Sequence, residues 1–159
     1  MSEPLLPTAR SETRARRAAS ARALARAIGV AVLSAGAVAL VGWILDVRIL
    51  KGLLPGMISI KVNTALGFVF TGLSLFRLAR SHPSRRDIAL GAAAAALATV
   101  IGGITLLEYT GRADFGIDQA LVTDAREDGN PGAPGRMAPS SAFSFVLVGV
   151  ALLCLATPR

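Results

Sequence analysis

The sequence has one cysteine and one histidine among its 159 residues. With a single cysteine, Cys154, the chain forms no intrachain disulfide and offers no cysteine cluster for zinc. No Ser/His/Asp order, glycine-rich phosphate loop or metal-ligand spacing occurs around His82 or elsewhere. We therefore expect no catalytic residue, no metal site and no cofactor, and we interpret the chain as non-enzymatic.

Aromatic residues are also scarce, at 5%, and 10 acidic residues face 17 basic ones, which gives a net charge of +7. Nucleic-acid-binding surfaces commonly combine basic residues with aromatic rings that stack on bases. Here the basic residues instead collect at the ends of apolar runs, so we expect no nucleic-acid partner. The chain is 53% hydrophobic and its mean hydropathy is +0.57. This apolar fraction is higher than that of typical soluble domains and indicates a protein embedded in a lipid bilayer.

Four apolar runs approach the length of about 20 residues that a spanning helix needs, with short spans near 17 allowed. They cover residues 27–45, 62–79, 88–107 and 141–157, and they leave connections at 46–61 and 108–140. The sequence thus predicts an all-α membrane protein with a four-helix transmembrane domain at 27–157. Residues 1–26 form a basic lead, helical from Ser11, whose arginines would lie against anionic headgroups.

Two of these runs resemble each other. Residues 63–79, NTALGFVFTGLSLFRLA, align with residues 140–156, SSAFSFVLVGVALLCLA, and the identical positions are mostly three or four residues apart. This spacing marks one helix face, so we predict two repeated helical hairpins, with chance similarity of apolar helices as the alternative. Gly72 and Gly149 would allow helix 62–79 to approach helix 141–157. The predicted helix-packing residues are Ala65, Phe68, Gly72, Ala142, Phe145 and Gly149.

The basic residues predict the orientation of the spans. Six arginines in the lead, four at 77–86 and one at the C-terminus make eleven on one side, against six basic and seven acidic residues on the other. Both termini should therefore be cytoplasmic, with 46–61 and 108–140 as outer loops. In a bacterium this is a multi-pass protein of the inner membrane. Trp43 and Tyr109 are expected in the aromatic belts at the membrane surface.

The longer outer loop carries the candidate binding residues, because loops of this length tend to be functional. Asp118 is placed as the N-cap of a short amphipathic helix, whose Leu121 and Val122 would dock on the bundle together with Phe115 and Ile117. Ion pairs that merely anchor the loop at the membrane surface are the alternative role for its acidic residues. The candidate ligand or partner residues are Glu108, Asp114, Asp118, Gln119 and Arg136.

Four segments carry a family resemblance: LPG, NTALGF…GLSL, LLEYTGRADFGIDQAL and PGRMAPSSAFSFVLVGVALL. Within about 45–156 the chain resembles the N-terminal membrane module that precedes PAS, histidine-kinase or diguanylate-cyclase domains in bacterial signalling proteins. The resemblance implies a four-helix sensory input domain with a membrane or cytoplasmic signalling partner. No output domain follows residue 157, so we expect a sensor or modulator of another protein, compatible with a homo-oligomer. A structural or assembly subunit of a larger membrane complex is the alternative.

Overall fold

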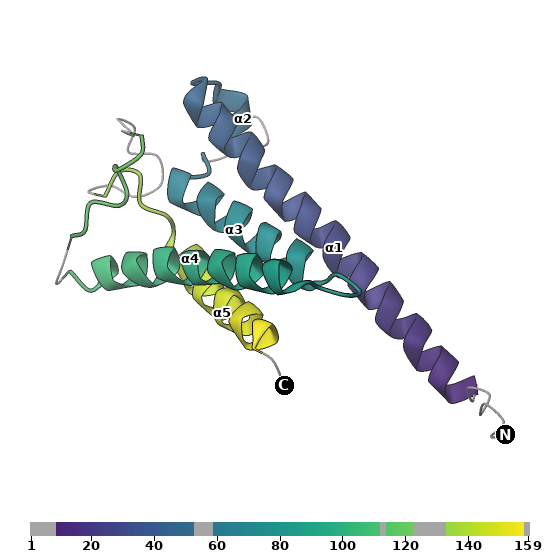
Figure 1. The fold of residues 1–159 in the computed structure, drawn as a ribbon. Helices are drawn as coiled ribbons and strands as arrows, with labels where there is room; N and C mark the ends of the chain where they lie inside the picture. The colour runs from purple at the N-terminus through teal and green to yellow at the C-terminus, as the bar shows by residue number, and fades with distance from the viewer. Residues whose placement is uncertain (1–8, 53–58, 112–113, 123–132, 158–159) are drawn as a thin grey trace, which may run out of the picture.

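The computed structural model describes residues 9–52, 59–111, 114–122 and 133–157, and it consists of helices and connections in these ranges (Figure 1). The all-helical prediction is therefore confirmed for this part of the chain. The helices are α1 (Ala9–Ile44), α2 (Arg48–Gly52), α3 (Val62–Leu78), α4 (Arg85–Tyr109) and α5 (Pro139–Ala156).

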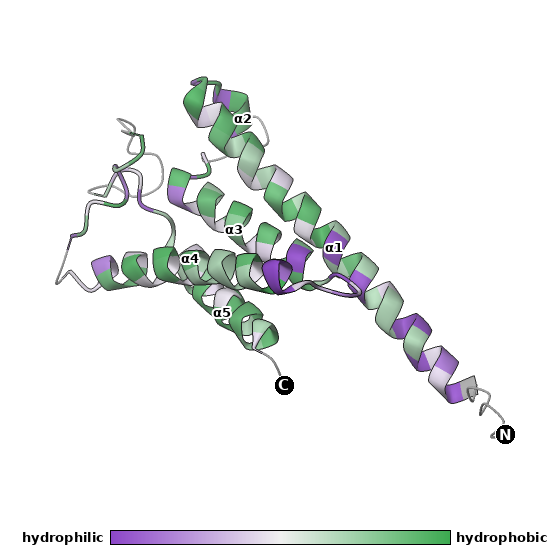
Figure 2. Cartoon of the chain, viewed as in Figure 1, coloured by the Kyte–Doolittle hydropathy of each residue, from purple (hydrophilic) through white to green (hydrophobic). Residues whose placement is uncertain are grey.

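Three of the described helices are long and apolar enough to cross a membrane, namely Arg10–Ile44, Arg85–Tyr109 and Pro139–Ala156. Helix α3 is apolar but shorter, with 17 residues. Large apolar side chains such as Val30, Leu97 and Leu147 remain exposed on the three long helices, and Figure 2 shows hydrophobic residues over most of the bundle. Apolar surface of this extent fits a lipid environment, which confirms a membrane-embedded protein.

Helix α1 runs for 36 residues without a break between the basic lead and the apolar run. At 1.5 Å per residue it is about 54 Å long, far longer than the bilayer core of about 30 Å. Its hydrophilic first half extends beyond the other helices (Figures 1 and 2). A lead that lies along the membrane surface needs a bend near residue 26, which α1 lacks. The alanine-rich sequence between Ala9 and Ile28 has no glycine or proline to cause one.

Helices α1 and α3 pack antiparallel, with their backbones in contact at glycines. A Cβ atom on Gly36 would lie 2.5 Å from the carbonyl oxygen of Ala65. A Cβ atom on Gly72 would lie 2.5 Å from the backbone nitrogen of Leu33 and 2.7 Å from the carbonyl oxygen of Gly29. Because no Cβ fits at these distances, glycine is what permits this close approach.

Helices α4 and α5 pack in the same manner. A Cβ atom on Gly102 would lie 2.5 Å from the carbonyl oxygen of Ala142, and Gly149 lies against Ala95 and Thr99. Gly72 therefore faces α1 and Gly149 faces α4, so the predicted contact between α3 and α5 through these two glycines is wrong. Helices α3 and α5 do meet, but in the N-terminal half of α3, near the loop that precedes α5.

The core lies where α3, α4 and α5 converge. Met137, Ala142 and Phe145 are buried there, with Phe68, Ile101 and Leu106 packed against them. The rings of Phe68 and Phe145 meet edge to face with their centroids 5.5 Å apart. Because Met137 directly follows Arg136, this core fixes the loop that carries the arginine onto the end of the bundle.

The short helix α2 folds back onto the end of α1 and covers Trp43. Lys51 is buried, its Nζ lies 2.5 Å from Asp46 Oδ1, and the same ammonium lies 4.1 Å from the centre of the Trp43 ring. Trp43 is itself buried and donates its indole N–H to the carbonyl oxygen of Ile60 at 2.7 Å. The prediction of Trp43 as a belt residue is therefore wrong. The expected break at Pro55-Gly56 lies outside the described residues.

Candidate functional site

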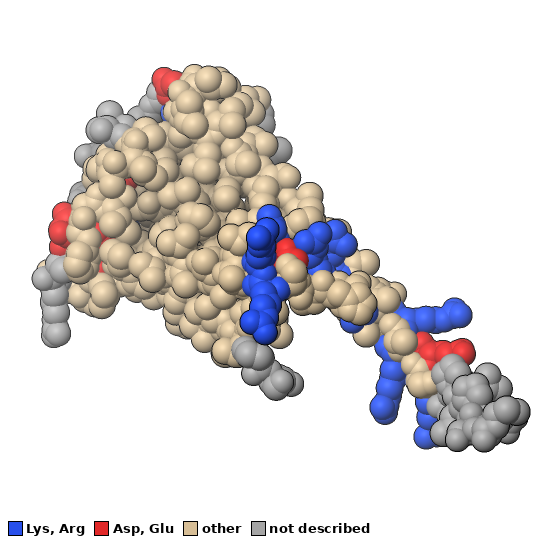
Figure 3. Space-filling view, viewed as in Figure 1, with Lys and Arg blue, Asp and Glu red and all other residues tan. Residues whose placement is uncertain are grey.

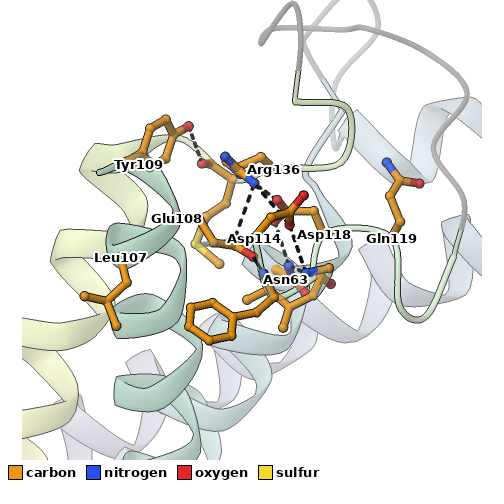
Figure 4. A network of polar contacts seen from close by, with 12 residues as sticks. Asn63, Leu107, Glu108, Tyr109, Asp114, Asp118, Gln119 and Arg136 are labelled. Carbon is orange, nitrogen blue, oxygen red and sulfur yellow. Dashed lines mark hydrogen bonds and ion pairs between the residues drawn. The ribbon is translucent and has the colours of Figure 1, made fainter. Parts of the chain in front are cut away.

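A group of charged and amide side chains gathers at the loop end of the bundle, defined as the end where α3 begins and α4 ends (Figure 4). Arg136 is its centre. Its Nε donates to Asp118 Oδ2 at 2.6 Å, and its Nη2 lies 3.6 Å from Glu108 Oε2 and 3.8 Å from Asp114 Oδ1. One guanidinium thus joins three carboxylates. The Arg136 cluster consists of Asn63, Glu108, Asp114, Asp118 and Arg136.

Asn63 ties the loop to the first turn of α3. Its Nδ2 donates to the carbonyl oxygen of Ile117 at 3.1 Å and to Asp118 Oδ1 at 3.3 Å, and both Asn63 and Asp118 are buried. Asp118 therefore accepts from α3 with one oxygen and from Arg136 with the other. A change at this single carboxylate affects the loop and α3 together.

Glu108 provides the connection to α4. Its side chain has no solvent exposure, and its Oε1 accepts the backbone N–H of Phe115 at 3.0 Å. Its Oε2 is buried without a hydrogen bond, 3.6 Å from Arg136 Nη2. The carboxylate stands at the C-terminal end of α4, where the helix dipole is negative. Arg136 supplies the compensating charge, since removing one partner of a buried ion pair strongly destabilises a fold.

The local backbone and charges hold Arg136 in place as a cation. Gly135 has φ +80°, and a Cβ at this residue would collide with the carbonyl oxygen of Asp118, so the chain before Arg136 needs glycine. Burial alone would lower the pKa of the Arg136 guanidinium. The hydrogen bond to Asp118 and the charges of the three carboxylates outweigh burial and raise this pKa above its usual value.

The structure brings Glu108, Asp118 and Arg136 together, while the other two candidate residues lie at the margin. Asp114 is 79% exposed, and its Oδ1 accepts the backbone N–H of Gly116. Gln119 points away from Arg136 in Figure 4 and donates to the carbonyl oxygen of Pro134 at 2.5 Å. Gln119 therefore links the two described loop segments to each other and does not join the cluster.

Asn63 and Asp87 were not among the candidate site residues predicted from the sequence, although Asn63 was noted as a polar group at membrane depth. Asn63 lies in the first turn of an apolar run, next to the acidic loop, and this position was the available signal. Asp87 is buried at the link end of the bundle, where α3 ends and α4 begins. Its carboxylate accepts from Arg80 at 2.7 Å, from Arg77 at 3.2 Å and from the Ser84 hydroxyl at 2.7 Å. The capping box of Ser84 and Asp87 is readable from their three-residue spacing.

The predicted short helix capped by Asp118 is wrong for the described part of the loop. Residues 117–119 form a turn and residues 120–122 a bend. Asp118 makes no cap because Arg136 and Asn63 occupy its two oxygens. Phe115 and Leu121 are more than half exposed, so they do not dock on the bundle. The later part of the expected helix, including Asp124, lies outside the described residues.

Comparisons of the chain with protein-family models, curated proteins and solved structures gave no match. The resemblance to sensory membrane modules therefore stays a prediction. Within the part of the chain that the structure describes, no group of three or more His, Cys, Asp or Glu residues is placed to hold a metal ion. The three carboxylates of the cluster are arranged around a guanidinium.

Proposed function

We propose that this chain is a non-enzymatic membrane sensory input module whose loop after α4 receives the signal. The observation that carries the proposal is the Arg136 cluster, because it connects two loop residues to two helices. Asp118 and Arg136 come from the loop, Asn63 from the start of α3 and Glu108 from the end of α4. A ligand or partner that engages the loop residues therefore acts on both helices at once.

The mechanism is a shift between two states of the cluster, driven by a ligand that binds them with different affinity. An anionic group that attracts Arg136 would leave Glu108 buried without its cation, at the negative end of the α4 dipole. Helix α4 would then move to relieve this cost. At the link end Asp87 ties α4 to Arg77 of α3 and to Arg80 of the connection that follows α3. A displacement of α4 would therefore reach the side on which a membrane or cytoplasmic signalling protein, or a second copy of the chain, reads it.

The four-span topology with both termini in the cytoplasm is part of this proposal. Helix α3 has 17 residues, about 26 Å, and it lies along α1 from the Gly36–Ala65 contact to the Gly29–Phe76 contact. This antiparallel packing supports a position of α3 at the same depth as the apolar part of α1. Figure 3 shows lysine and arginine gathered where α4 begins and along the first half of α1. That distribution supports an inner-membrane protein with the link end in the cytoplasm.

The contacts also support a duplicated hairpin. Some contacts between α1 and α3 have counterparts between α4 and α5. The counterpart is found by adding 66 to the residue number on α1 and 77 to the residue number on α3 or on the segment before it. Three contacts correspond in this way: Gly36–Ala65 with Gly102–Ala142, Gly29–Gly72 with Ala95–Gly149, and the hydrogen bond from Trp43 to Ile60 with that from Tyr109 to Met137.

Reporter fusions test the proposed topology. Fusions after Arg80 and after Arg159 should read cytoplasmic, and fusions near Gly129, outside the described residues, should read external. The physical reason is the excess of basic residues at the link end and in the lead. A cytoplasmic signal near Gly129 would exclude the four-span arrangement.

A chimera tests the sensing role, with a histidine-kinase catalytic domain fused after Thr157 to supply the output. Asp118→Ala should change basal autophosphorylation at an unchanged amount of protein in the membrane, because it removes the acceptor of both Asn63 and Arg136. Losing these buried hydrogen bonds should cost about 1 to 3 kcal/mol locally. Leu121→Ala is the control, since that loop side chain is 65% exposed and does not belong to the Arg136 cluster.

The same chimera separates sensing from the structural alternative. Unchanged autophosphorylation with Asp118→Ala, and again with residues 114–122 replaced by a Gly/Ser segment of equal length, would contradict the sensing role. The loop would then be a connector, for which composition matters little. Stoichiometric copurification with one membrane complex would in that case establish an assembly subunit.

A further inference from the structure

The face of α1 that packs on α3 continues past the end of α3 and becomes basic there. Gly36, Leu33 and Gly29 contact α3 and are spaced by three and four residues, and the same spacing leads on to Arg26 and Arg22. A Cβ on Gly29 would touch Phe76, close to the end of α3 at Leu78. Arg26 and Arg22 therefore lie on the α3 side of α1, at and beyond the point where α3 ends.

Contacts fix the first of these arginines. The guanidinium carbon of Arg26 lies 5.1 Å from the centre of the Phe76 ring, a distance typical of a cation–π contact. Such a contact uses one face of the planar guanidinium and leaves its N–H groups available for an acceptor. Arg26 is thus held beside the end of α3, and its N–H groups make no hydrogen bond or ion pair with the described residues and can bind an anion.

The end of α3, the connection after it and the start of α4 add four more arginines at the same end. Arg77 and Arg80 share the single carboxylate of Asp87, while Arg85 and Arg86 are exposed and form no ion pair with any described residue. Six arginines and one aspartate give a formal charge of 6 − 1 = +5. Figure 3 shows this concentration of basic side chains around one acidic residue.

The position of this positive charge identifies the class of ligand. The arginines stand where the apolar helices end, since α3 ends at Leu78 and the apolar α4 begins at Arg85. Exposed apolar side chains follow the arginines within about one helical turn on each helix, with Ile28 after Arg26 on α1 and Leu90 after Arg86 on α4. A ligand that fits both surfaces has a phosphate for the guanidinium groups and acyl chains for the helices.

We propose that Arg22, Arg26, Arg77, Arg80, Arg85 and Arg86 form a binding site around the end of α3 for the headgroup phosphate of an anionic glycerophospholipid. This lipid bridges the extended half of α1 and the α3–α4 link. Neither part of the site belongs to the Arg136 cluster, which lies at the opposite end of the bundle. The proposal is therefore independent of the proposed sensing function.

Native mass spectrometry of the purified protein in a neutral detergent tests the site. Phosphatidylglycerol should be retained in preference to phosphatidylcholine with the same acyl chains. Arg22→Gln combined with Arg26→Gln should weaken retention about 30-fold, since each basic residue near an anionic surface contributes on the order of 1 kcal/mol and 1.4 kcal/mol is tenfold. Arg14→Gln combined with Arg17→Gln makes the same charge change on α1, but outside the helix face that carries Arg22 and Arg26. This control should leave phosphatidylglycerol retention unchanged.

A second variant guards against a folding defect. Arg85→Gln combined with Arg86→Gln alters exposed side chains that touch no described acidic group, and it should also weaken phosphatidylglycerol retention. Equal weakening by the Arg14/Arg17 control would overturn the proposal, because it would reflect general charge attraction. Equal retention of phosphatidylcholine would overturn it as well. Displacement of the lipid by inorganic phosphate or glycerol phosphate at the same concentration would overturn the lipid as the source of the phosphate.

Discussion

Arg136→Met is expected to destabilise the protein by about 3 to 5 kcal/mol, the usual cost of removing one partner of a buried ion pair. The loss leaves the carboxylates of Glu108 and Asp118 without their cation, and their side chains are 0% and 6% exposed. Methionine keeps much of the apolar stem of arginine, so lost packing contributes little. The measurement is the free energy of unfolding in mixed micelles titrated with dodecyl sulfate, followed by circular dichroism.

Two comparisons separate lost charge compensation from a general effect of removing an arginine. Arg48→Met removes an exposed arginine of α2 and should cost under about 1 kcal/mol. Glu108→Gln added to Arg136→Met should recover part of the loss, because a neutral amide no longer needs a cation. Equal destabilisation by Arg136→Met and Arg48→Met would show that the cluster holds no buried charge.

A double-mutant cycle distinguishes the partners of Arg136. The coupling of Arg136 with Asp118 should clearly exceed its coupling with Asp114, because the Asp118 contact is 2.6 Å and buried whereas Asp114 is 3.8 Å away and exposed. Exposed ion pairs contribute about 0 to 1 kcal/mol. Equal coupling energies would contradict Asp118 as the main partner of Arg136.

The positions of three helices were predictable from local sequence patterns. Runs 62–79, 88–107 and 141–157 became Val62–Leu78, Arg85–Tyr109 and Pro139–Ala156, with boundaries within about three residues. These boundaries depend on capping and proline, which act within one turn. A helix from Ser11 was predicted close to the observed start of α1 at Ala9. Its unbroken continuation into the apolar run was not predicted, because a search for apolar runs treats a polar, alanine-rich helix as a separate segment.

The packing partners of these helices could not be predicted, because the sequence of one helix face does not determine which apolar helix packs against it. The repeated face marks Gly72 and Gly149 as positions of close approach, yet both neighbouring helices of each are apolar. The candidate site has the same limit. Asp118 and Arg136 are 18 residues apart, and the acidic residues of the loop had several arginines on the same side to choose from. In the structure Met137 packs in the core, and this contact holds the neighbouring Arg136 at the end of the bundle.

The glycines of the α1–α3 interface provide the second large effect. Gly72→Ala and Gly36→Ala are each expected to destabilise the protein by about 1 to 3 kcal/mol, the cost of overpacking a close interface. At both positions the new Cβ would lie 2.5 Å from backbone atoms of the facing helix. A flexible side chain could move away from this contact, but a helix backbone cannot, so the two helices must separate.

Gly103→Ala is the matched control, because this glycine also lies within a long apolar helix but a Cβ there would meet nothing within 4 Å. Since alanine forms helices better than glycine by roughly 0.8 to 1 kcal/mol, Gly103→Ala should leave stability unchanged or raise it. The same dodecyl sulfate titration measures all three variants. If Gly36→Ala and Gly72→Ala proved as harmless as Gly103→Ala, α1 would not pack against α3 at these glycines. The repeated face would then contact lipid, and the proposed four-span arrangement would lose its main support.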